Sequence, residues 1–140
     1  MLYGIPKTFT PDLMKLLMEV GHGEQLLICD GNFPYKSRNK DTVFILNIKI
    51  SDLLNDILKF LPLDHAVEIP TMVMSGALDN GTADVYKKII SKYREGDSLG
   101  TIDRFGFYDL SDQVVGIIVT NDFTKFGNII IQKGIVVEEN

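Results

Sequence analysis

The chain has 140 residues, of which 45% are hydrophobic and 24% are charged, and its formal net charge is −5. These values are typical of one globular domain over residues 1–140, and no segment approaches the roughly 18 consecutive apolar residues of a membrane helix. The absence of a Lys/Arg cluster argues against nucleic-acid binding, while a single cysteine and a start without a secretory signal favour the cytoplasm.

The first predicted helix follows Thr10, whose hydroxyl can cap it, with a proline and an acidic residue in its first turn. Apolar residues then recur at helical spacing until Gly21, a residue type that commonly ends helices. His22 therefore lies in the turn after this helix, between two glycines. Residues 26–29 form a short apolar run that predicts a strand buried on both faces, with parallel neighbours. Asp30 stands at the carboxyl end of that strand.

Strand and helix patterns continue to alternate along the rest of the chain, except that residues 102–112 are rich in aromatic side chains and fit neither pattern clearly. This alternation favours an α/β fold, in which helices pack on the faces of a layered sheet, over separate helical and all-β layers. The further elements predicted are strands over residues 43–50, 71–76, 114–120 and 128–136, and helices over residues 51–61, capped by Ser51, and 82–93.

His22 and Asp30 are the first candidates for functional residues. The flanking glycines leave the imidazole of His22 uncrowded, and an imidazole can donate and accept protons near neutral pH. A lone histidine in a loop is, however, more often a surface or hydrogen-bonding residue. Asp30 lies where open α/β sheets commonly bind ligands, although an aspartate before glycine also forms Asx turns. We expect one site in which Asp30 orients ligand hydroxyls beside His22.

Two later segments carry further candidates. Residues 104–108, RFGFY, offer a guanidinium and a phenol among apolar rings. Their alternative interpretation is a core stripe, with both phenylalanines inward and Arg104 in solvent. Asn128 could bind a ligand through its amide or could simply form a turn before the last strand.

The sequence lacks the spaced motifs of several other classes of functional site. The sequence contains no GxGxxG opening a helix after a strand, no GxxxxGK[ST], no HExxH and no GxSxG. His22 and His65 lie far apart in the sequence, and one cysteine leaves a poor ligand set for structural zinc. We therefore expect no metal ion and no nucleotide cofactor.

The order and spacing of five segments resemble the L-fucose mutarotase and D-ribose pyranase family: GIPKTFTPDLMKLLMEVGHG, ICDGNFP, PLD, IDRFGFY and KFGNIIIQKG. The resemblance covers nearly the whole chain. Its specific part is the unit from GHG to DxNFP, combined with RFxFY and with GN before the last strand. The fucose branch is the more similar one, because NFP stands at residues 32–34 and RFGFY is intact.

This resemblance implies a cofactor-free enzyme that interconverts sugar anomers, built as a homo-oligomer, commonly a decamer of two pentameric rings. It implies that His22 is the proton donor, that Tyr108 is catalytic and that Asp30 binds the substrate. One position departs from the family pattern, because Phe126 stands where the family usually has a tyrosine. The other positions that the family uses around the sugar are Asp64, Arg104 and Asn128.

We therefore expect a cytoplasmic mutarotase that opens and recloses the ring of L-fucose or a related monosaccharide by acid/base catalysis. Three alternatives stay open at this point. The substrate could be D-ribose, converted between pyranose and furanose forms. The protein could bind a monosaccharide without catalysis, because hydroxyl recognition and proton transfer use the same residue types. It could also be a structural ring protein with a vestigial pocket.

Overall fold

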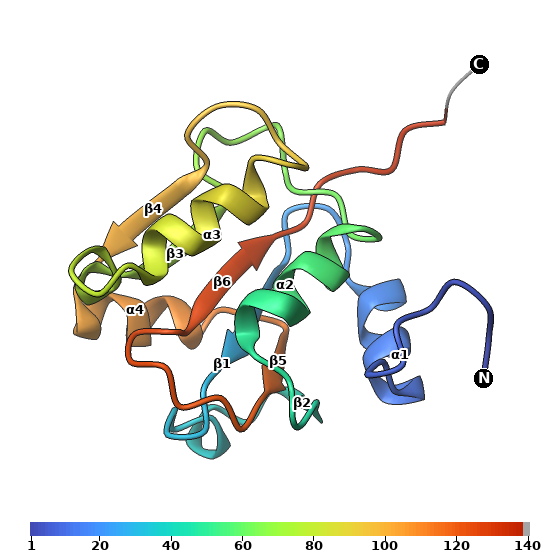
Figure 1. Cartoon of the computed structure of the whole chain (residues 1–140), viewed down its shortest axis with the longest axis horizontal. Helices are drawn as coiled ribbons and strands as arrows, with labels where there is room; N and C mark the ends of the chain where they lie inside the picture. The colour runs from blue at the N-terminus through green and yellow to red at the C-terminus, as the bar shows by residue number, and fades with distance from the viewer. Residues whose placement is uncertain (139–140) are drawn as a thin grey trace.

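Six strands form one mixed sheet at the centre of the protein, in the order β2-β5-β1-β6-β3-β4 (Figure 1). The computed structural model describes residues 1–138. β1 and β2 are each parallel to β5, and β3 is parallel to β4, whereas β6 is antiparallel to β1 and β3. The strands are β1 (Gln25–Cys29), β2 (Asp41–Phe44), β3 (Thr71–Met74), β4 (Leu99–Ile102), β5 (Gly116–Val119) and β6 (Ile129–Gln132).

The reversed direction of β6 decides which loops meet. Because the other strands share one direction, their carboxyl ends lie beside the start of β6, and we call this side the carboxyl end of the sheet. Asp30 directly follows β1 there and Asn128 directly precedes β6. At the opposite side, the amino end, Gln25 of β1 is paired with Gln132 of β6.

Helices cover both faces of the sheet, as the α/β prediction requires. Alternate residues of a strand point to opposite faces, so Leu26 and Ile28 pack toward α1, α2 and α3, while Leu27 packs with Phe107 of α4. No helix within residues 1–138 is long and apolar enough to cross a membrane. The helices are α1 (Pro11–Glu19), α2 (Ile50–Leu58), α3 (Thr82–Ile90) and α4 (Arg104–Ser111), with short 3₁₀ turns at η1 (Lys36–Arg38) and η2 (Ser75–Leu78).

The first predicted elements are confirmed. Thr10 caps α1, because its hydroxyl oxygen accepts a hydrogen bond from the backbone nitrogen of Leu13 at 3.1 Å. His22 lies in the turn that follows. β1 is buried as expected, but only its β5 neighbour is parallel. The last two predicted strands correspond to β5 and β6, and the helix predicted from Thr82 is α3, which ends at Ile90.

The segment before α2 differs from the prediction. A strand was expected over residues 43–50, but β2 ends at Phe44 and Asn47 takes a left-handed conformation with φ of 61°. α2 then begins at Ile50, without a cap from Ser51. Its cap comes from a distant loop, since the carboxylate of Asp122 accepts a hydrogen bond from the backbone nitrogen of Ile50 at 2.9 Å.

The aromatic segment that fitted no pattern forms β4 and α4. α4 begins after Asp103, whose side chain accepts a hydrogen bond from the backbone nitrogen of Gly106 at 2.9 Å. Phe107 is buried, but Phe105 is 72% exposed, so the interpretation with both phenylalanines inward is wrong. Positions 105 and 107 fall on different faces of a helix, whereas alternation in a strand would have placed them together.

Candidate functional site

A cavity of about 250 Å³ opens at the carboxyl end of the sheet. It lies where β1 and β3 end and where α4 and β6 begin. Parallel strands commonly bind ligands at this end. Five of the predicted site residues line it: Asp30, Arg104, Tyr108, Phe126 and Asn128. The remaining lining residues are Asn32, Phe33, Met74, Phe123 and Lys125.

Asp30 and Asn128 hold each other at the base of this cavity. The backbone nitrogen of Asp30 donates to the amide oxygen of Asn128 at 2.8 Å. A carboxylate oxygen of Asp30 accepts from the backbone nitrogen of Asn32 at 2.9 Å, so the Asx turn predicted as an alternative is present. The amide nitrogen of Asn128 has two hydrogens, so it can donate to the Asp30 carboxyl and still donate to a ligand.

Burial shifts the pKa of Asp30. The residue is only 9% exposed, and this burial raises the pKa of its carboxyl above the ordinary value, although hydrogen bonds from Asn32, Phe33 and Asn128 oppose the shift. A carboxyl with a raised pKa takes up a proton more readily than an exposed one. The neighbouring Cys29 is also buried, which raises the pKa of its thiol to about 12 and leaves it unreactive at neutral pH.

α4 supplies a phenol held by a guanidinium. Arg104 and Tyr108 are four residues apart on this helix, so they share one face. The Nε of Arg104 donates to the hydroxyl oxygen of Tyr108 at 3.0 Å. The phenol proton is therefore available to another acceptor. The ring of Tyr108 packs edge-on against Phe33, with ring centroids 5.6 Å apart.

Apolar side chains line the rest of the cavity, and Phe126 is the most constrained of them. It has a left-handed φ of 57°, a conformation that is uncommon for a bulky residue. Its ring lies against Gly76, where an added Cβ would come within 2.5 Å of the ring. Phe123 covers Gly31 in a similar way. The cavity thus has one protic side and one aromatic side, a combination that suits a sugar with a polar edge and an apolar face.

His22 and Asp64 lie at the other end of the sheet. The Nε2 of His22 is 3.1 Å from Oδ1 of Asp64. The same carboxylate accepts from the backbone nitrogen of Ala66 and from the side-chain nitrogen of Gln132, each at 2.9 Å. Gln132 is held in turn by a 3.0 Å hydrogen bond from Gln25. We call His22, Asp64, Gln132 and Gln25 the amino-end cluster.

The charges of this cluster are set by hydrogen bonds. Asp64 is buried, and donors from Ala66, Gln132 and His22 lower its pKa below the ordinary value. It therefore stays ionised and can orient the imidazole. The side chain of His22 is 51% exposed, so its remaining surface is open to another molecule.

The structure does not bring His22 and Asp30 together in one chain. They flank β1, whose five residues span about 16 Å when extended. Within one subunit, therefore, the two residues lie at opposite ends of the sheet and do not share a cavity. Asp64 lies outside the cavity for the same reason, beside His22 rather than beside Asp30.

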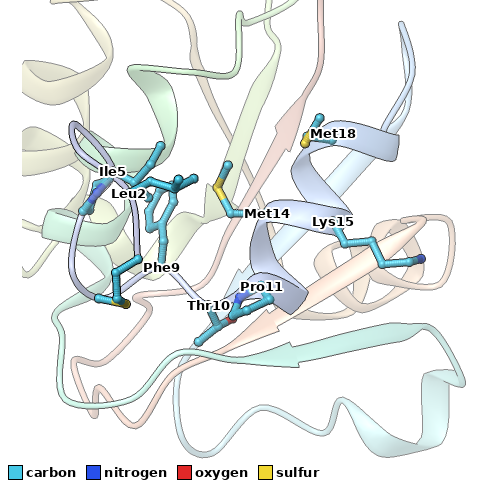
Figure 2. A pocket seen from close by; sticks show the side chains of 10 residues that line it. Leu2, Ile5, Phe9, Thr10, Pro11, Met14, Lys15 and Met18 are labelled. Atoms are coloured by element: carbon cyan, nitrogen blue, oxygen red, sulfur yellow. The ribbon is translucent and has the colours of Figure 1, made fainter.

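A second cavity, of about 440 Å³, lies between the N-terminal segment and α1 (Figure 2). Its lining is mainly apolar, including Leu2, Phe9 and Met14. The two polar side chains there are engaged elsewhere, because Thr10 caps α1 and Lys15 extends away to an ion pair with Glu19 at 2.7 Å. This cavity is larger but lacks groups for proton transfer, so the carboxyl-end cavity is the better candidate site.

Asn32 and Phe33 belong to the DxNFP unit noted in the sequence, whereas three other cavity residues were not predicted: Met74, Phe123 and Lys125. Met74 ends β3, so its position was recoverable from the rule that ligands bind at the carboxyl ends of parallel strands. Lys125 stands next to Phe126 within a segment already singled out. Phe123 gave no comparable signal. Within residues 1–138 no group of three His, Cys, Asp or Glu side chains is placed to hold a metal ion.

Comparison with known proteins agrees with this fold. An L-fucose mutarotase of Histophilus somni (strain 2336) is 34% identical over 140 residues, covering 96% of this chain and 97% of that protein. FucU from Bifidobacterium longum superposes with a TM-score of 0.88 at 35% identity, covering 95% of this chain and all (100%) of that one. The fucose mutarotase of Streptococcus pneumoniae, solved in complex with L-fucose, gives a TM-score of 0.90 at 32% identity, covering 97% and 100%.

The family assignment follows from a match over almost the whole chain. The model of the RbsD / FucU transport protein family matches residues 3–136. The relatives above share the fold over nearly their full lengths. This confirms the resemblance found in the sequence motifs, and the chain belongs to the RbsD/FucU family.

Proposed function

We propose that this protein is a cofactor-independent sugar mutarotase that interconverts the α and β anomers of L-fucose or a closely related monosaccharide. The observation that carries the proposal is the carboxyl-end cavity, which combines the buried carboxyl of Asp30, the Arg104-bound phenol of Tyr108 and aromatic rings. Fucose mutarotases among the family relatives support this choice of substrate. We place the protein in the cytoplasm, where free monosaccharides are metabolised.

The reaction needs only proton transfers. The anomeric hydroxyl loses its proton while the bond from the anomeric carbon to the ring oxygen breaks, and the ring oxygen gains a proton. The aldehyde that results rotates and recloses in the other configuration. All five predicted residues of the cavity are available for this reaction. In this proposal Tyr108 transfers a proton, Asp30, Arg104 and Asn128 bind sugar hydroxyls, and Phe126 contacts the apolar side. A positioned acid or base typically accelerates such a step about 10²–10⁴-fold.

His22 can act on this cavity only from a second copy of the chain. We propose that it is the proton donor and that a neighbouring subunit presents its amino-end cluster to the cavity. The half-exposed imidazole and the distance along β1 support this arrangement. A contact between opposite ends of two copies is heterologous, and repeated contacts of this kind form a ring when the rotation between copies closes. The decamer of two pentameric rings implied by the family resemblance is such an assembly.

Asp64 then takes a different role from the one its motif suggested. Its carboxylate oxygens are engaged by His22, Ala66 and Gln132, which leaves little capacity for a sugar hydroxyl. We propose that Asp64 orients His22 and stabilises its protonated form, as carboxylates commonly do for functional histidines.

Saturation-transfer NMR tests the proposal directly. Catalytic amounts of the protein should transfer saturation between the two anomeric proton signals of L-fucose. His65→Ala is the control for the His22→Ala variant. It removes the other histidine, which is exposed and lies outside the cavity. D-ribose is measured in parallel, and exchange between its pyranose and furanose signals without fucose exchange would favour pyranase activity. Binding without exchange would instead indicate a monosaccharide-binding protein, and neither would indicate a vestigial pocket.

A further inference from the structure

Arg38 lies outside the lining of the cavity but contacts two residues that form it. Its side chain is only 9% exposed. The guanidinium carbon lies 4.9 Å from the ring centroid of Phe33 and 5.1 Å from that of Tyr108. Arginine placed over aromatic faces at this distance is attracted by the ring electrons, and more strongly when it is desolvated.

Tyr108 is consequently flanked by two cations. Arg104 lies 5.3 Å from the same ring and also donates to its hydroxyl. When the phenol gives up its proton, negative charge develops on its oxygen and spreads into the ring. Positive charge held nearby in a partly buried site stabilises that state. Arg104 supplies one of these positive charges, and Arg38 supplies the other from a different segment of the chain.

The backbone contacts of Arg38 explain how it is fixed. Its Nη1 donates to the carbonyl oxygen of Pro34 at 2.5 Å, and its Nε lies 3.5 Å from the carboxylate of Asp112 at the end of α4. Pro34 belongs to the loop that follows Asp30, and Asp112 is four residues beyond Tyr108. Arg38 therefore ties the loop that carries the substrate-binding carboxyl to the helix that carries the phenol.

We infer that Arg38 is a positioning residue for Tyr108, acting through the tyrosine ring rather than through the sugar. The inference rests on the proposed mutarotase function, in which Tyr108 transfers a proton. It predicts that Arg38 affects the turnover of bound sugar more than the binding of sugar. It also predicts that a lysine, which keeps the charge but lacks the planar fork, replaces arginine only in part.

The test compares Arg38→Met and Arg38→Lys with the wild-type protein, measuring exchange over a range of L-fucose concentrations. We expect kcat to fall about tenfold in Arg38→Met with a smaller change in KM, and Arg38→Lys to recover part of the loss. In a Tyr108→Phe background the ring remains but the ionisable hydroxyl is gone, so the same Arg38→Met change should alter the rate by less than about twofold. An equal effect in both backgrounds would overturn the inference.

Arg94→Met is the matched control. Arg94 also fixes loop backbone, donating to the carbonyl of Val67 at 2.7 Å. Its buried Nε makes no hydrogen bond, and neither does that of Arg38. Within the described part of the chain, however, it lies over no aromatic ring. Any loss that Arg94→Met shows measures the general effect of removing a loop-anchoring arginine.

A second readout does not depend on activity. In protein labelled at tyrosine, the ring signals of Tyr108, assigned with Tyr108→Phe, should shift in Arg38→Met and stay unchanged in Arg94→Met. If the wild-type protein exchanges no sugar, the proposed function fails while this measurement still decides the contact. Unmoved Tyr108 signals in a folded Arg38→Met protein would overturn the inference.

Discussion

The two ends of the sheet place the same kind of side chain in opposite electrostatic environments. At the carboxyl end, burial raises the pKa of Asp30 and the surrounding groups form a cavity. At the amino end, several donors lower the pKa of Asp64 and its partner His22 reaches solvent. A carboxyl with a raised pKa suits hydroxyl binding, whereas one with a lowered pKa suits holding an imidazole. In the proposed assembly, the two ends supply complementary halves of one acid/base site.

β6 links these two halves physically. Because it runs against its neighbours, it begins at the carboxyl end with Asn128 and finishes at the amino end with Gln132. Asn128 holds the backbone of Asp30, and Gln132 holds the carboxylate of Asp64. One short strand thus orients both functional carboxyls, and its four residues keep them apart.

The largest expected effect comes from disabling the amino-end histidine in one variant and the carboxyl-end cavity in another, and then assembling the two variants together. His22→Ala should reduce anomer exchange about 10²–10⁴-fold, because it removes the proton donor from every site in the assembly. Asp30→Asn should also reduce exchange, because it weakens sugar binding in every cavity. If sites form between copies, co-assembling the two variants restores some sites that have an intact cavity facing an intact histidine. For random mixing at equal amounts, about a quarter of the sites are restored.

Mixing must occur before assembly, so the variants are co-expressed and the recovered activity is compared with that of proteins mixed after purification. Light scattering establishes that each variant is folded and associated. Activity that stays at the level of the single variants in co-assembled protein would show that His22 does not serve a neighbouring cavity. A monomeric wild-type protein would contradict the shared site as well.

The second prediction uses pH to separate the two carboxyls. The lowered pKa of Asp64 means that its ionised form stabilises the folded state above the ordinary carboxyl range, and this is lost as pH falls through the folded pKa. Asp64→Asn should therefore lower Tm at neutral pH, by about 3–6 °C, with the difference shrinking in acid. Asp30 has a raised pKa, so its ionised form destabilises the fold above that pKa and Asp30→Asn should raise Tm at neutral pH.

Thermal unfolding of both variants from neutral to acidic pH measures these differences against the wild-type protein. Both variants replace a carboxylate by an amide of the same size, so each serves as the control for the other. Shifts of the same sign in both variants would contradict the opposite environments of the two residues.

The sequence was sufficient for much of the fold, and the reasons are local. The cap at Thr10, the helical spacing after it and the apolar run of β1 are each encoded within a few residues, and all three are confirmed. The cap of α2 was not predicted because Asp122, which supplies it, lies 72 residues away in the sequence. Such a contact exists only after the chain has folded.

The candidate site was predictable only in part for a similar reason. Motif positions identified five residues of the cavity, since ligand positions cluster at the carboxyl ends of strands. The strand predicted between His22 and Asp30 already implied that the two residues lie at its opposite ends. Sequence spacing could not show that His22 pairs with Asp64, because that contact depends on how distant segments pack. Arg38 carried no motif at all, and its relation to Tyr108 depends on how the loop after β1 packs on α4.

The smallest predicted effect concerns Phe126. This aromatic residue lines the carboxyl-end cavity together with the protic groups. A phenol there could donate one hydrogen bond to a sugar oxygen, which is worth about 0.5–1.5 kcal/mol, or up to roughly tenfold in rate or affinity. The ring is 40% exposed and lies on Gly76, so an added hydroxyl enters a partly open space. We expect Phe126→Tyr to speed L-fucose exchange or tighten binding by up to about tenfold.

Gly76→Ala is the matched control, because an added Cβ would come within 2.5 Å of the Phe126 ring and push it from its position without changing its chemistry. Saturation transfer and sugar titration on both variants separate the two contributions. A gain in Phe126→Tyr with a loss in Gly76→Ala indicates that the ring at position 126 contacts the sugar and that this chain works without a hydrogen-bond donor there. If neither variant changes exchange or binding, position 126 faces away from the sugar, and the apolar contact to the sugar comes from Phe33, Met74 or Phe123 instead.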